Sequence, residues 1–389
     1  MKILISTFTF FPQVSGIANV TIEHAKHFET EGHQVTIVTS SDRERSFTSI
    51  QNIEIIEFDV KGGPLLSNLY RGEVSKYIAF LNNAIYEYDL IYFHGWQIWT
   101  TDLFLFVNTH RALAKTVLVS HCSPVTSWST FPELVRALLL LPYKILLMPI
   151  LIRKFDKLVF LSNKIDGDRQ WDYRYALKKC PHEKIHIIEN GIPSIDKNSK
   201  IDRVNLLSEW GINDTKIILY MANYDRIKDQ QAAFKVFTKV SPMIDCHLVF
   251  IGGKYNKYSD KLLKSIKEKK VGDKVSVLSN LSRQEVLSFF SISYMTLFTS
   301  KSECYPLSIL ESIAYQKPVV STNVGSVNKI PGVIVCDDIA SLTRETELLL
   351  SSNHYYCNKV KEIGKKGELL SWPNVMKKHD QLIINNLLR

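Results

Sequence analysis

The sequence predicts an α/β protein with two successive parallel sheets. Three observations support this: apolar runs alternate with stretches of helical spacing, the pattern restarts after Gly191, and the chain has 389 residues. A single hydrophobic core stops growing at about 250–300 residues, so two domains are expected. Strands that are apolar throughout are typical of parallel sheets covered by helices on both faces.

The first elements form a β-α-β unit. Residues 2–7 (KILIST) are an apolar run, residues 17–32 have helical spacing and end at Gly32, and residues 33–40 are a second apolar run. Such a unit builds a parallel sheet with a right-handed crossover. The apolar start lacks the basic region and the small-residue cleavage site of a signal peptide, so we interpret it as the first strand.

The later apolar runs divide the chain into two parts. We predict a first domain at residues 1–192, a linker at 193–213 that leads into a short helix, and a second domain at 214–370, because each part has its own series of strands. The further strand candidates are residues 53–58, 89–94, 115–121, 157–162 and 184–190 in the first part and 216–223, 246–253, 274–280, 294–300, 317–323 and 332–336 in the second.

Charge and cysteine usage limit the partners and the compartment. The net charge is +9 and the pI about 9.0, which favours partners that carry phosphate: nucleic acid, anionic lipid or nucleotide substrates. No zinc-finger, homeodomain or RNP-type pattern occurs, so we do not expect a nucleic-acid partner. The six cysteines are scattered and form no C-x-x-C pair. This pattern indicates reduced thiols in a cytoplasmic protein.

Residues that follow the predicted strands are the first candidates for a site. Ligands of open parallel sheets bind at the carboxyl ends of the strands. His94, His121 and Asn190-Gly191 hold such positions in the first half, and Gly252 and Ser300 hold them in the second. Both halves supply candidates, so the sequence predicts a site in a cleft between two facing domains.

Two glutamates, Glu303 and Glu311, lie in an otherwise apolar, helix-like stretch. Pro306 suits the first position of the helix, and the free N–H groups from Tyr305 to Ser308 can hold polar oxygens. If the segment were all helix, the two carboxylates would span about 12 Å, a length that suits a ribose and a hexose. Spacing alone leaves an ordinary interpretation open, in which one glutamate is solvated and the other meets the helix dipole.

The string ECYPLSILESIAYQKPV, which starts at Glu303, resembles the E-x7-E signature of retaining, family-4-type (group 1) glycosyltransferases. Ser312 and Gln316 depart from the usual alanine and glycine, which affects packing more than chemistry. The resemblance covers nearly the whole chain and implies the GT-B fold. This fold has two Rossmann-like domains that face across a cleft, and a C-terminal helix, here residues 371–389, that packs back toward the first domain.

The resemblance implies roles for residues of the second half. Glu311 would bind the donor ribose and Glu303 the donor sugar. Lys228 matches a family lysine that faces the leaving diphosphate, while the usual arginine position is Asn223, with Arg226 nearby. The other donor-binding positions implied in this half are Gly252, Cys304, Tyr305, Pro306 and Leu307.

In the first half the resemblance implies that Gly16 approaches the diphosphate. It also implies that His121 acts catalytically at the donor sugar and that His94 lies on the acceptor side. Core or loop histidines remain an alternative for both. The family needs no metal and no cofactor, and the donor phosphate assists a front-face transfer.

Residues 131–155 are the most apolar stretch of the chain. They nearly reach the length of a membrane span, but Arg136 and Lys144 interrupt them, and Pro142 and Pro149 break them. Three interpretations stay open: a span, a buried helix pair, or a helix that lies on an anionic membrane surface. The last would place the protein peripherally at the inner face of the cytoplasmic membrane, next to a lipid-linked acceptor.

The function we predict is transfer of a hexose or N-acetylhexosamine from a nucleotide sugar, by preference a UDP-sugar, to a glycan or lipid-linked acceptor. Bacterial surface polysaccharide or lipopolysaccharide assembly is the expected setting. Two alternatives stay open: a sugar-nucleotide epimerase of similar architecture, and a non-catalytic sugar-nucleotide-binding partner subunit. An epimerase would not need the E-x7-E segment, and release of free nucleotide diphosphate separates the two enzyme classes.

Overall fold

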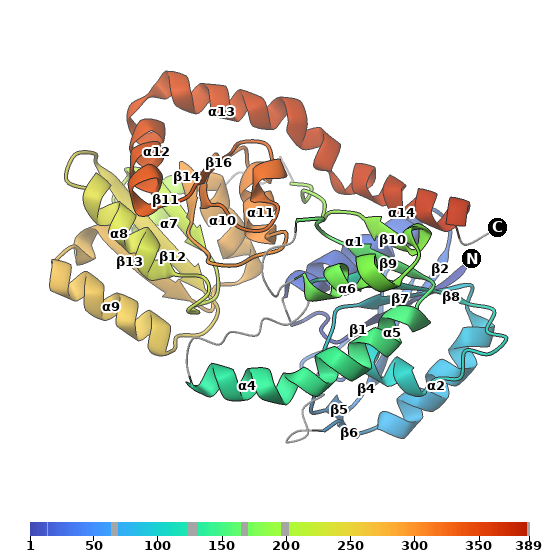
Figure 1. Ribbon diagram of the computed structural model, residues 1–389. Helices are drawn as coiled ribbons and strands as arrows, with labels where there is room; N and C mark the ends of the chain where they lie inside the picture. The colour runs from blue at the N-terminus through green and yellow to red at the C-terminus, as the bar shows by residue number, and fades with distance from the viewer. Residues whose placement is uncertain (14, 64–68, 123–130, 165–169, 196–201, 387–389) are drawn as a thin grey trace. The chain divides into compact units, whose positions relative to one another are not determined.

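The computed structural model describes residues 1–386 except 14, 64–68, 123–130, 165–169 and 196–201. The chain forms two compact units (Figure 1). The first unit comprises Met1–Asn190 and Val375–Arg389, and the second unit comprises Gly191–Asn374. Each unit contains one large sheet, so the predicted α/β class with two sheets is confirmed. Part of the predicted linker and the last three residues lie outside the described residues.

The sheet of the first unit is parallel except at one edge. Its strand order is β10-β9-β8-β7-β1-β2-β4-β3, and only the β3–β4 pair is antiparallel. A separate hairpin pairs β5 with β6. The bounds are β1 Lys2–Thr7, β2 Gln34–Ser40, β3 Ser49–Ile50, β4 Ile53–Phe58, β5 Val60–Lys61, β6 Arg71–Gly72, β7 Leu90–His94, β8 Lys115–Ser120, β9 Lys157–Phe160 and β10 Ile185–Ile187.

Helices cover both faces of this sheet. One face packs on α2, α5 and α6 through a core that includes Tyr77, Leu81, Leu151 and Ala176. Strands buried on both faces explain the continuous apolar runs of the sequence. The bounds are α1 Gly16–Thr30, α2 Val74–Glu87, α3 Trp99–Asp102, η1 Leu103–Phe106, α4 Phe131–Pro142, η2 Tyr143–Leu147, α5 Met148–Lys154, α6 Trp171–Lys179 and η3 His182–Lys184.

The last helix, α14 (Trp372–Asn386), joins the first unit from Val375 onward. Lys378 pairs with Glu189 at 2.7 Å, and the Asp380 carboxylate pairs with the His27 ring at 3.0 Å. Val375, Met376 and Leu382 are buried. The expected return of the C-terminal helix to the first domain is therefore confirmed.

The sheet of the second unit is parallel throughout, with the order β13-β12-β11-β14-β15-β16. Alternate strand residues face two cores: one is covered by α8, α9 and α12, and the other by α7 and α10. The bounds are α7 Arg203–Glu209, β11 Lys216–Met221, α8 Gln230–Val240, β12 Cys246–Gly252, α9 Lys257–Lys269, η4 Gly272–Lys274, β13 Val275–Ser279, α10 Arg283–Ile292, β14 Met295–Phe298, α11 Leu307–Ala314, β15 Val319–Thr322, η5 Val327–Lys329, β16 Val333–Cys336, α12 Ile339–Ser351, α13 Asn353–Lys366 and η6 Gly367–Leu370.

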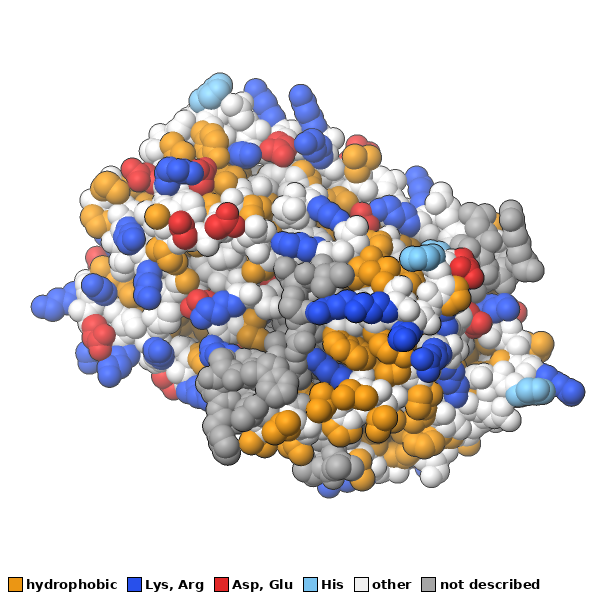
Figure 2. All heavy atoms as spheres, viewed as in Figure 1, with side chains coloured by type: hydrophobic (Ala, Val, Ile, Leu, Met, Phe, Trp, Pro, Cys, Tyr) orange, Lys and Arg blue, Asp and Glu red, His pale blue; other side chains and the backbone are white. Residues whose placement is uncertain are grey.

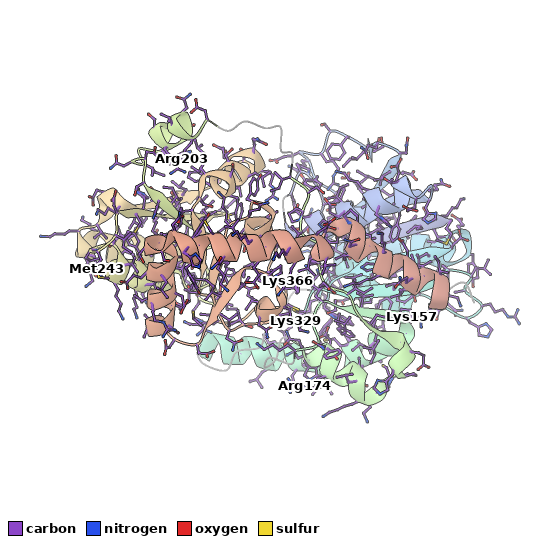
Figure 3. All side chains as sticks on the ribbon, turned by 90° about the horizontal axis from the view of Figure 1, so that it is seen from above. Lys157, Arg174, Arg203, Met243, Lys329 and Lys366 are labelled. Atoms are coloured by element: carbon purple, nitrogen blue, oxygen red, sulfur yellow. The ribbon has the colours of Figure 1, made fainter. Side chains whose placement is uncertain are left out.

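The short helix α7 anchors the start of the second unit. Arg203, labelled in Figure 3, donates to the carbonyls of Thr215 and Ile292 and pairs with Asp214 at 2.9 Å. Asp202 caps the helix by accepting from the N–H groups of Val204 and Asn205. These contacts fix the entry into β11, the strand whose loop carries Lys228.

Candidate active site

Glu303 lies in the loop between β14 and α11, and its side chain is buried. The Nζ atom of Lys228, from the loop after β11, lies 2.5 Å from Glu303 Oε1. The two loops are also joined through the backbone, because the Lys301 N–H donates to the Ile227 carbonyl at 2.7 Å. The structure therefore brings together two of the predicted catalytic residues at the carboxyl edge of the second sheet.

The helix that follows Glu303 begins one residue later than predicted. Pro306 has φ −73° and ψ 120°, so it is the N-cap of α11, and Leu307 is the first helical residue. The difference arises because ψ at Pro306 is extended rather than helical. The N–H groups of the first turn of a helix have no partner inside it, so the start of α11 keeps the polar character that the sequence indicated.

Glu311 lies in the middle of α11 and is buried, with 7% of its surface exposed. Burial raises the pKa of its carboxyl group, and the charge of Arg283 opposes that rise. Arg283 Nη2 lies 2.5 Å from Glu311 Oε1. A buried carboxylate stays ionised only where a partner compensates for the lost hydration, and Arg283 is that partner.

Sequence reasoning missed Arg283. It opens α10, a few residues after β13, which is a strand-end position like those of the predicted candidates. Its position after a strand was the feature of the sequence that could have identified Arg283 as a candidate. Its pairing with Glu311 joins residues of two different helices, which local spacing does not indicate.

A second loop supports the Glu303 loop from the other side. Ser326 N–H donates to the Cys304 carbonyl at 3.0 Å. Gly325 has φ +53°, and a Cβ atom there would lie 2.4 Å from the Cys304 carbonyl oxygen. Only glycine fits this contact without displacing the backbone next to Glu303.

The remaining donor-binding candidates of the second unit lie near these loops in the sequence. Arg226 lies in the turn two residues before Lys228. Gly252 ends β12, and a Cβ there would lie 2.5 Å from the Tyr224 ring, so the structure gives this glycine a packing reason. Asn223 accepts a hydrogen bond from the Gly253 N–H at 3.2 Å. The roles of Arg226 and Gly252 toward a donor stay predictions.

Of the three candidates of the first unit, His94 ends β7, His121 directly follows β8, and Gly16 lies after the loop that follows β1. Gly16 begins α1, whose N-cap Ser15 accepts from the Ala18 N–H at 3.1 Å. His94 is fully buried and its Nδ1 atom lies 3.0 Å from Nε2 of His121. The structure thus brings the two histidines together. Their contacts with sugar or acceptor stay predictions.

These two histidines begin a row of four. The His24 ring lies 5.1 Å from the His94 ring and 4.5 Å from the His379 ring on α14. Burial lowers the pKa of all four, to about 4 for His121 and about 3 for His379. The row therefore consists of neutral imidazoles at physiological pH.

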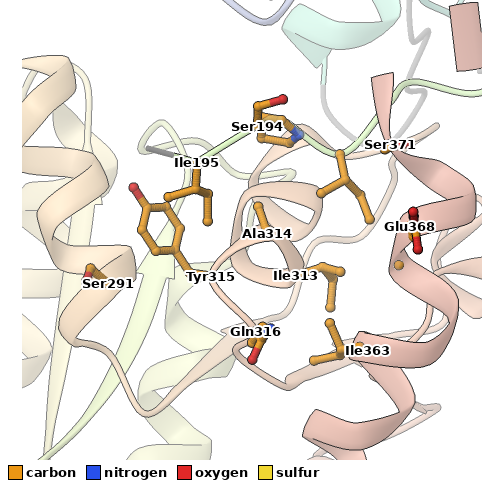
Figure 4. A pocket seen from close by; sticks show the side chains of 14 residues that line it. Ser194, Ile195, Ser291, Ile313, Ala314, Tyr315, Gln316, Ile363, Glu368 and Ser371 are labelled. Atoms are coloured by element: carbon orange, nitrogen blue, oxygen red, sulfur yellow. The ribbon is translucent and has the colours of Figure 1, made fainter. Parts of the chain in front are cut away.

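Two further observations bear on ligands. Within the part of the chain that the structure describes, no group of three or more His, Cys, Asp or Glu side chains is arranged to hold a metal ion. A cavity of about 480 Å³ lies at the C-terminal end of α11, at the opposite end from Glu303 (Figure 4). Ile195, Ile313 and Ile363 contribute apolar wall, and none of the predicted site residues lines it.

The match to known families covers both units. Residues 14–194 match the family described as Glycosyltransferase Family 4, and residues 203–367 match Glycosyl transferases group 1. The chain belongs to the group 1 glycosyltransferases. The predicted resemblance is thereby confirmed.

One curated relative is the O-antigen biosynthesis glycosyltransferase WclY of Escherichia coli, 30% identical over 173 residues, which are 44% of each chain. The matched regions span less than half of the length of the curated relatives that head the comparison.

Solved structures support the fold over the whole chain. A glycosyltransferase from Rickettsia africae matches with a TM-score of 0.74 at 18% identity, covering 100% of this chain and 98% of that one. Alr3699/HepE from Anabaena, in complex with UDP and glucose, matches with a TM-score of 0.70 at 14% identity, covering 99% and 100%. The predicted GT-B fold with two Rossmann-like domains is confirmed.

Proposed function

We propose that this protein is a retaining glycosyltransferase that moves a hexose or N-acetylhexosamine from a nucleotide sugar to a glycan or lipid-linked acceptor. The observation that carries the proposal is the pair of buried glutamates, Glu303 in the loop before α11 and Glu311 within that helix, each paired with a cation from another element, Lys228 or Arg283. Family membership makes sugar transfer the chemistry that such a site serves.

The transfer breaks the bond between the anomeric carbon of the donor and its phosphate oxygen, and forms a bond from that carbon to an acceptor oxygen. The acceptor proton passes to the departing diphosphate. Negative charge grows on the diphosphate, and preorganised cations and N–H dipoles stabilise such charge. We assign this role to Lys228 and to the N–H groups at the start of α11. Glu303 holds hydroxyl groups of the sugar, and Glu311 holds the ribose.

We propose UDP as the donor nucleotide, a metal-independent reaction, and surface polysaccharide as the setting. A complex of HepE with UDP and glucose supports the choice of nucleotide by analogy, and the part that WclY takes in O-antigen biosynthesis supports the setting. His121 and Gly16 complete the proposed set from the first unit.

A thermal-shift panel tests the proposal. UDP, GDP, ADP, CMP and their common sugar conjugates are added with and without EDTA. A ligand at 100 times its Kd stabilises by about 2.7 kcal/mol, which is readily measured. We expect a selective shift that EDTA leaves unchanged and that Glu311→Gln abolishes. The matched control is Glu268→Gln, which alters an exposed carboxylate on α9.

Two results would contradict the proposal. If no nucleotide stabilises the protein, the fold has been kept without a donor site, and a binding-partner role becomes the better hypothesis. If a UDP-sugar is converted to another UDP-sugar without release of UDP, the protein is an epimerase.

We further propose that the helical segment from α4 to α5 lies on the anionic inner surface of the cytoplasmic membrane. No helix in the described part of the chain is long and apolar enough to span a bilayer. One side of the segment is buried, including Tyr143, Met148 and Leu151. Its other side exposes large apolar side chains, in the lower middle of Figure 2: Val135, Leu138, Leu139, Leu141, Ile145, Leu146 and Ile150.

Basic side chains border this exposed apolar face. Lys154 donates to the carbonyls of Leu105 and Val107, next to the exposed Phe106. Lys184 donates to the backbone carbonyl of Arg153 at the end of α5, and the Arg153 guanidinium lies over the Tyr175 ring. Arg174, labelled in Figure 3, comes from the neighbouring α6 and is partly exposed, whereas Lys157 of β9, also labelled there, is buried and donates to the Glu183 carbonyl at 2.6 Å. An apolar helix face with a basic border is typical of interfacial helices.

Sedimentation with vesicles tests the membrane surface. We expect binding to vesicles that contain phosphatidylglycerol, weaker binding to neutral vesicles and in high salt, and loss of binding in Leu146→Glu. Leu263→Glu, at an exposed leucine of α9 in the other unit, is the matched control. Equal binding of both variants, or none by the unaltered protein, would contradict a membrane contact through this face.

A further inference from the structure

We propose that Arg283 is a positioning residue of the donor site: it keeps the Glu311 carboxylate ionised and aimed at the place where the donor ribose binds. This inference rests on the proposed function, because it assigns Glu311 to the ribose. It adds a residue to the site that neither the E-x7-E segment nor the Lys228 loop contains.

The local structure fixes Arg283 firmly. Ser282 caps α10, its hydroxyl accepts from the Glu285 N–H, and the Glu285 side chain accepts from the Ser282 N–H at 2.6 Å. This capping box sets the direction of the first turn, and Arg283 is its first residue. From there the guanidinium reaches across to α11 and meets Glu311 Oε1 at 2.5 Å.

The location of this arginine is unfavourable for α10 itself. The N-terminus of a helix carries partial positive charge, so a cation in the first turn weakens the helix. The ion pair with Glu311 offsets that cost. Residues that go against a local preference of their helix are typical of functional sites, which favours a role for Arg283 beyond helix formation.

Glu311 depends on Arg283 for its charge. With 7% of its surface exposed, it has little contact with water. Among the described residues, Arg283 on α10 and Tyr315, one turn further along the chain, are the ionisable groups coupled to it. Tyr315 is neutral at physiological pH, because burial raises its pKa. Arg283 therefore supplies the compensating charge.

The ion pair has a direct consequence for ribose binding. Arg283 contacts Oε1, and we expect ribose hydroxyls to donate to Oε2. An ionised carboxylate accepts hydrogen bonds from both ribose hydroxyls. A protonated carboxyl group is a weaker acceptor, and its own O–H is a donor that does not match the hydroxyl donors of the ribose. Removing Arg283 would let the buried carboxyl group of Glu311 take up a proton near neutral pH. Ribose binding would then weaken as the pH falls and this group becomes protonated.

The experiment measures the Kd for UDP, GDP and ADP by calorimetry on the full chain from pH 5.5 to 8.5. The unaltered protein is expected to bind one nucleotide, and its Kd at each pH is the reference for the variants, because the terminal phosphate of the nucleotide itself titrates in this range. Arg283→Ala is expected to bind more than tenfold more weakly at pH 6.5 and to recover as the pH rises. Arg283→Lys keeps the charge and is expected to lie between the two.

Arg344→Ala is the matched control, since Arg344 also pairs with a glutamate of this unit, Glu345 at 3.0 Å, but its own side chain is exposed on α12. It is expected to bind as the unaltered protein does. A loss in Arg283→Ala that is equal at all pH values would mean that Arg283 only packs, and unchanged binding would remove it from the site. Binding of no nucleotide by the unaltered protein would instead overturn the proposed function, together with this inference.

Discussion

The two units differ in the charge of the groups that follow their strands. In the second unit, the groups at the carboxyl edge are ionised pairs, Lys228 with Glu303 and Arg283 with Glu311. In the first unit, the corresponding groups are the buried His94 and the half-buried His121, which stay neutral. A site that handles a diphosphate needs fixed charge, while neutral imidazoles suit hydroxyl groups and protons. The difference indicates that the second unit suits a diphosphate and the first unit suits hydroxyl groups.

Burial is the common cause behind this difference. It penalises the charged form of every group, so a buried group keeps its charge only with an opposite partner. Glu303 and Glu311 have such partners. The histidines face each other instead, and each additional proton would be repelled by the next ring. The same low exposure therefore gives ions in one unit and neutral rings in the other.

The largest effect is expected from removing a charge of the second unit. Glu303→Gln should reduce the transfer rate by about 100- to 1000-fold, the range seen when one preorganised group of an active site is lost. UDP should still bind, because Glu311 and Arg283 remain. Release of UDP from the donor, measured together with UDP affinity, checks this. Glu268→Gln should leave the rate within about twofold, and full activity of Glu303→Gln would remove that glutamate from the mechanism.

The next effect concerns the backbone that holds Glu303. Gly325→Ala places a Cβ against the Cys304 carbonyl and forces alanine into left-handed backbone. We expect a loss of about 3 kcal/mol in the free energy of unfolding of the second unit, with weaker donor binding. Gly211→Ala is the matched control. Gly211 has φ +62° and no atom within 4 Å of its Cβ position, so it should lose only about 1 kcal/mol. Equal losses in a urea titration would contradict the close contact.

The neutral histidines of the first unit predict a loss of stability in acid. The pKa of His379 is about 3 in the folded chain and near 6.5 when unfolded, so the unfolded chain binds the extra proton in between. Stability from this group is complete above pH 6.5 and is lost as the pH falls toward 3. At pH 5 the loss amounts to about 2 kcal/mol for His379.

Thermal unfolding between pH 7.5 and 5 checks this sign. His379→Gln should have a smaller pH dependence than the unaltered protein. His354→Gln, at an exposed histidine of the second unit, should not alter the pH dependence. A stability that rises toward pH 5 would mean that the row holds protons rather than neutral rings.

The second unit's site could be predicted from sequence further than the first unit's. Glu303 and Glu311 lie eight positions apart in one loop and helix, so the segment could be related to the E-x7-E signature from sequence alone. Lys228 was predicted because it lies in the loop after a strand and matches a family lysine there. Arg283 was not, since its partner lies on another helix and only the packing of α10 beside α11 brings them together. The strands themselves could be predicted from continuous apolar segments, because parallel strands are apolar on both faces.

Less of the first unit's arrangement could be predicted from the sequence. His24, His94, His121 and His379 come from four elements, and only the sheet topology and the return of α14 place them in one row. Likewise, the apolar run from Phe131 to Lys154 does not reveal which of its faces is covered. The structure decides that one side packs on the core and the other is exposed.

The smallest expected effect compares the helix caps of the two units. Ser15 caps α1 beside Gly16, and Ser282 caps α10 beside Arg283. Either serine changed to alanine should cost about 1 kcal/mol of unfolding free energy, because an N–H group loses its acceptor, while Ser15→Gly should cost only a few tenths. Denaturant titration checks the stabilities, and calorimetry with UDP separates the roles. Ser282→Ala should also weaken UDP binding, since the turn that aims Arg283 loosens. If Ser15→Ala weakens UDP binding as much, the start of α1 holds the diphosphate as predicted for Gly16. If it does not, the prediction that the start of α1 holds the diphosphate is wrong.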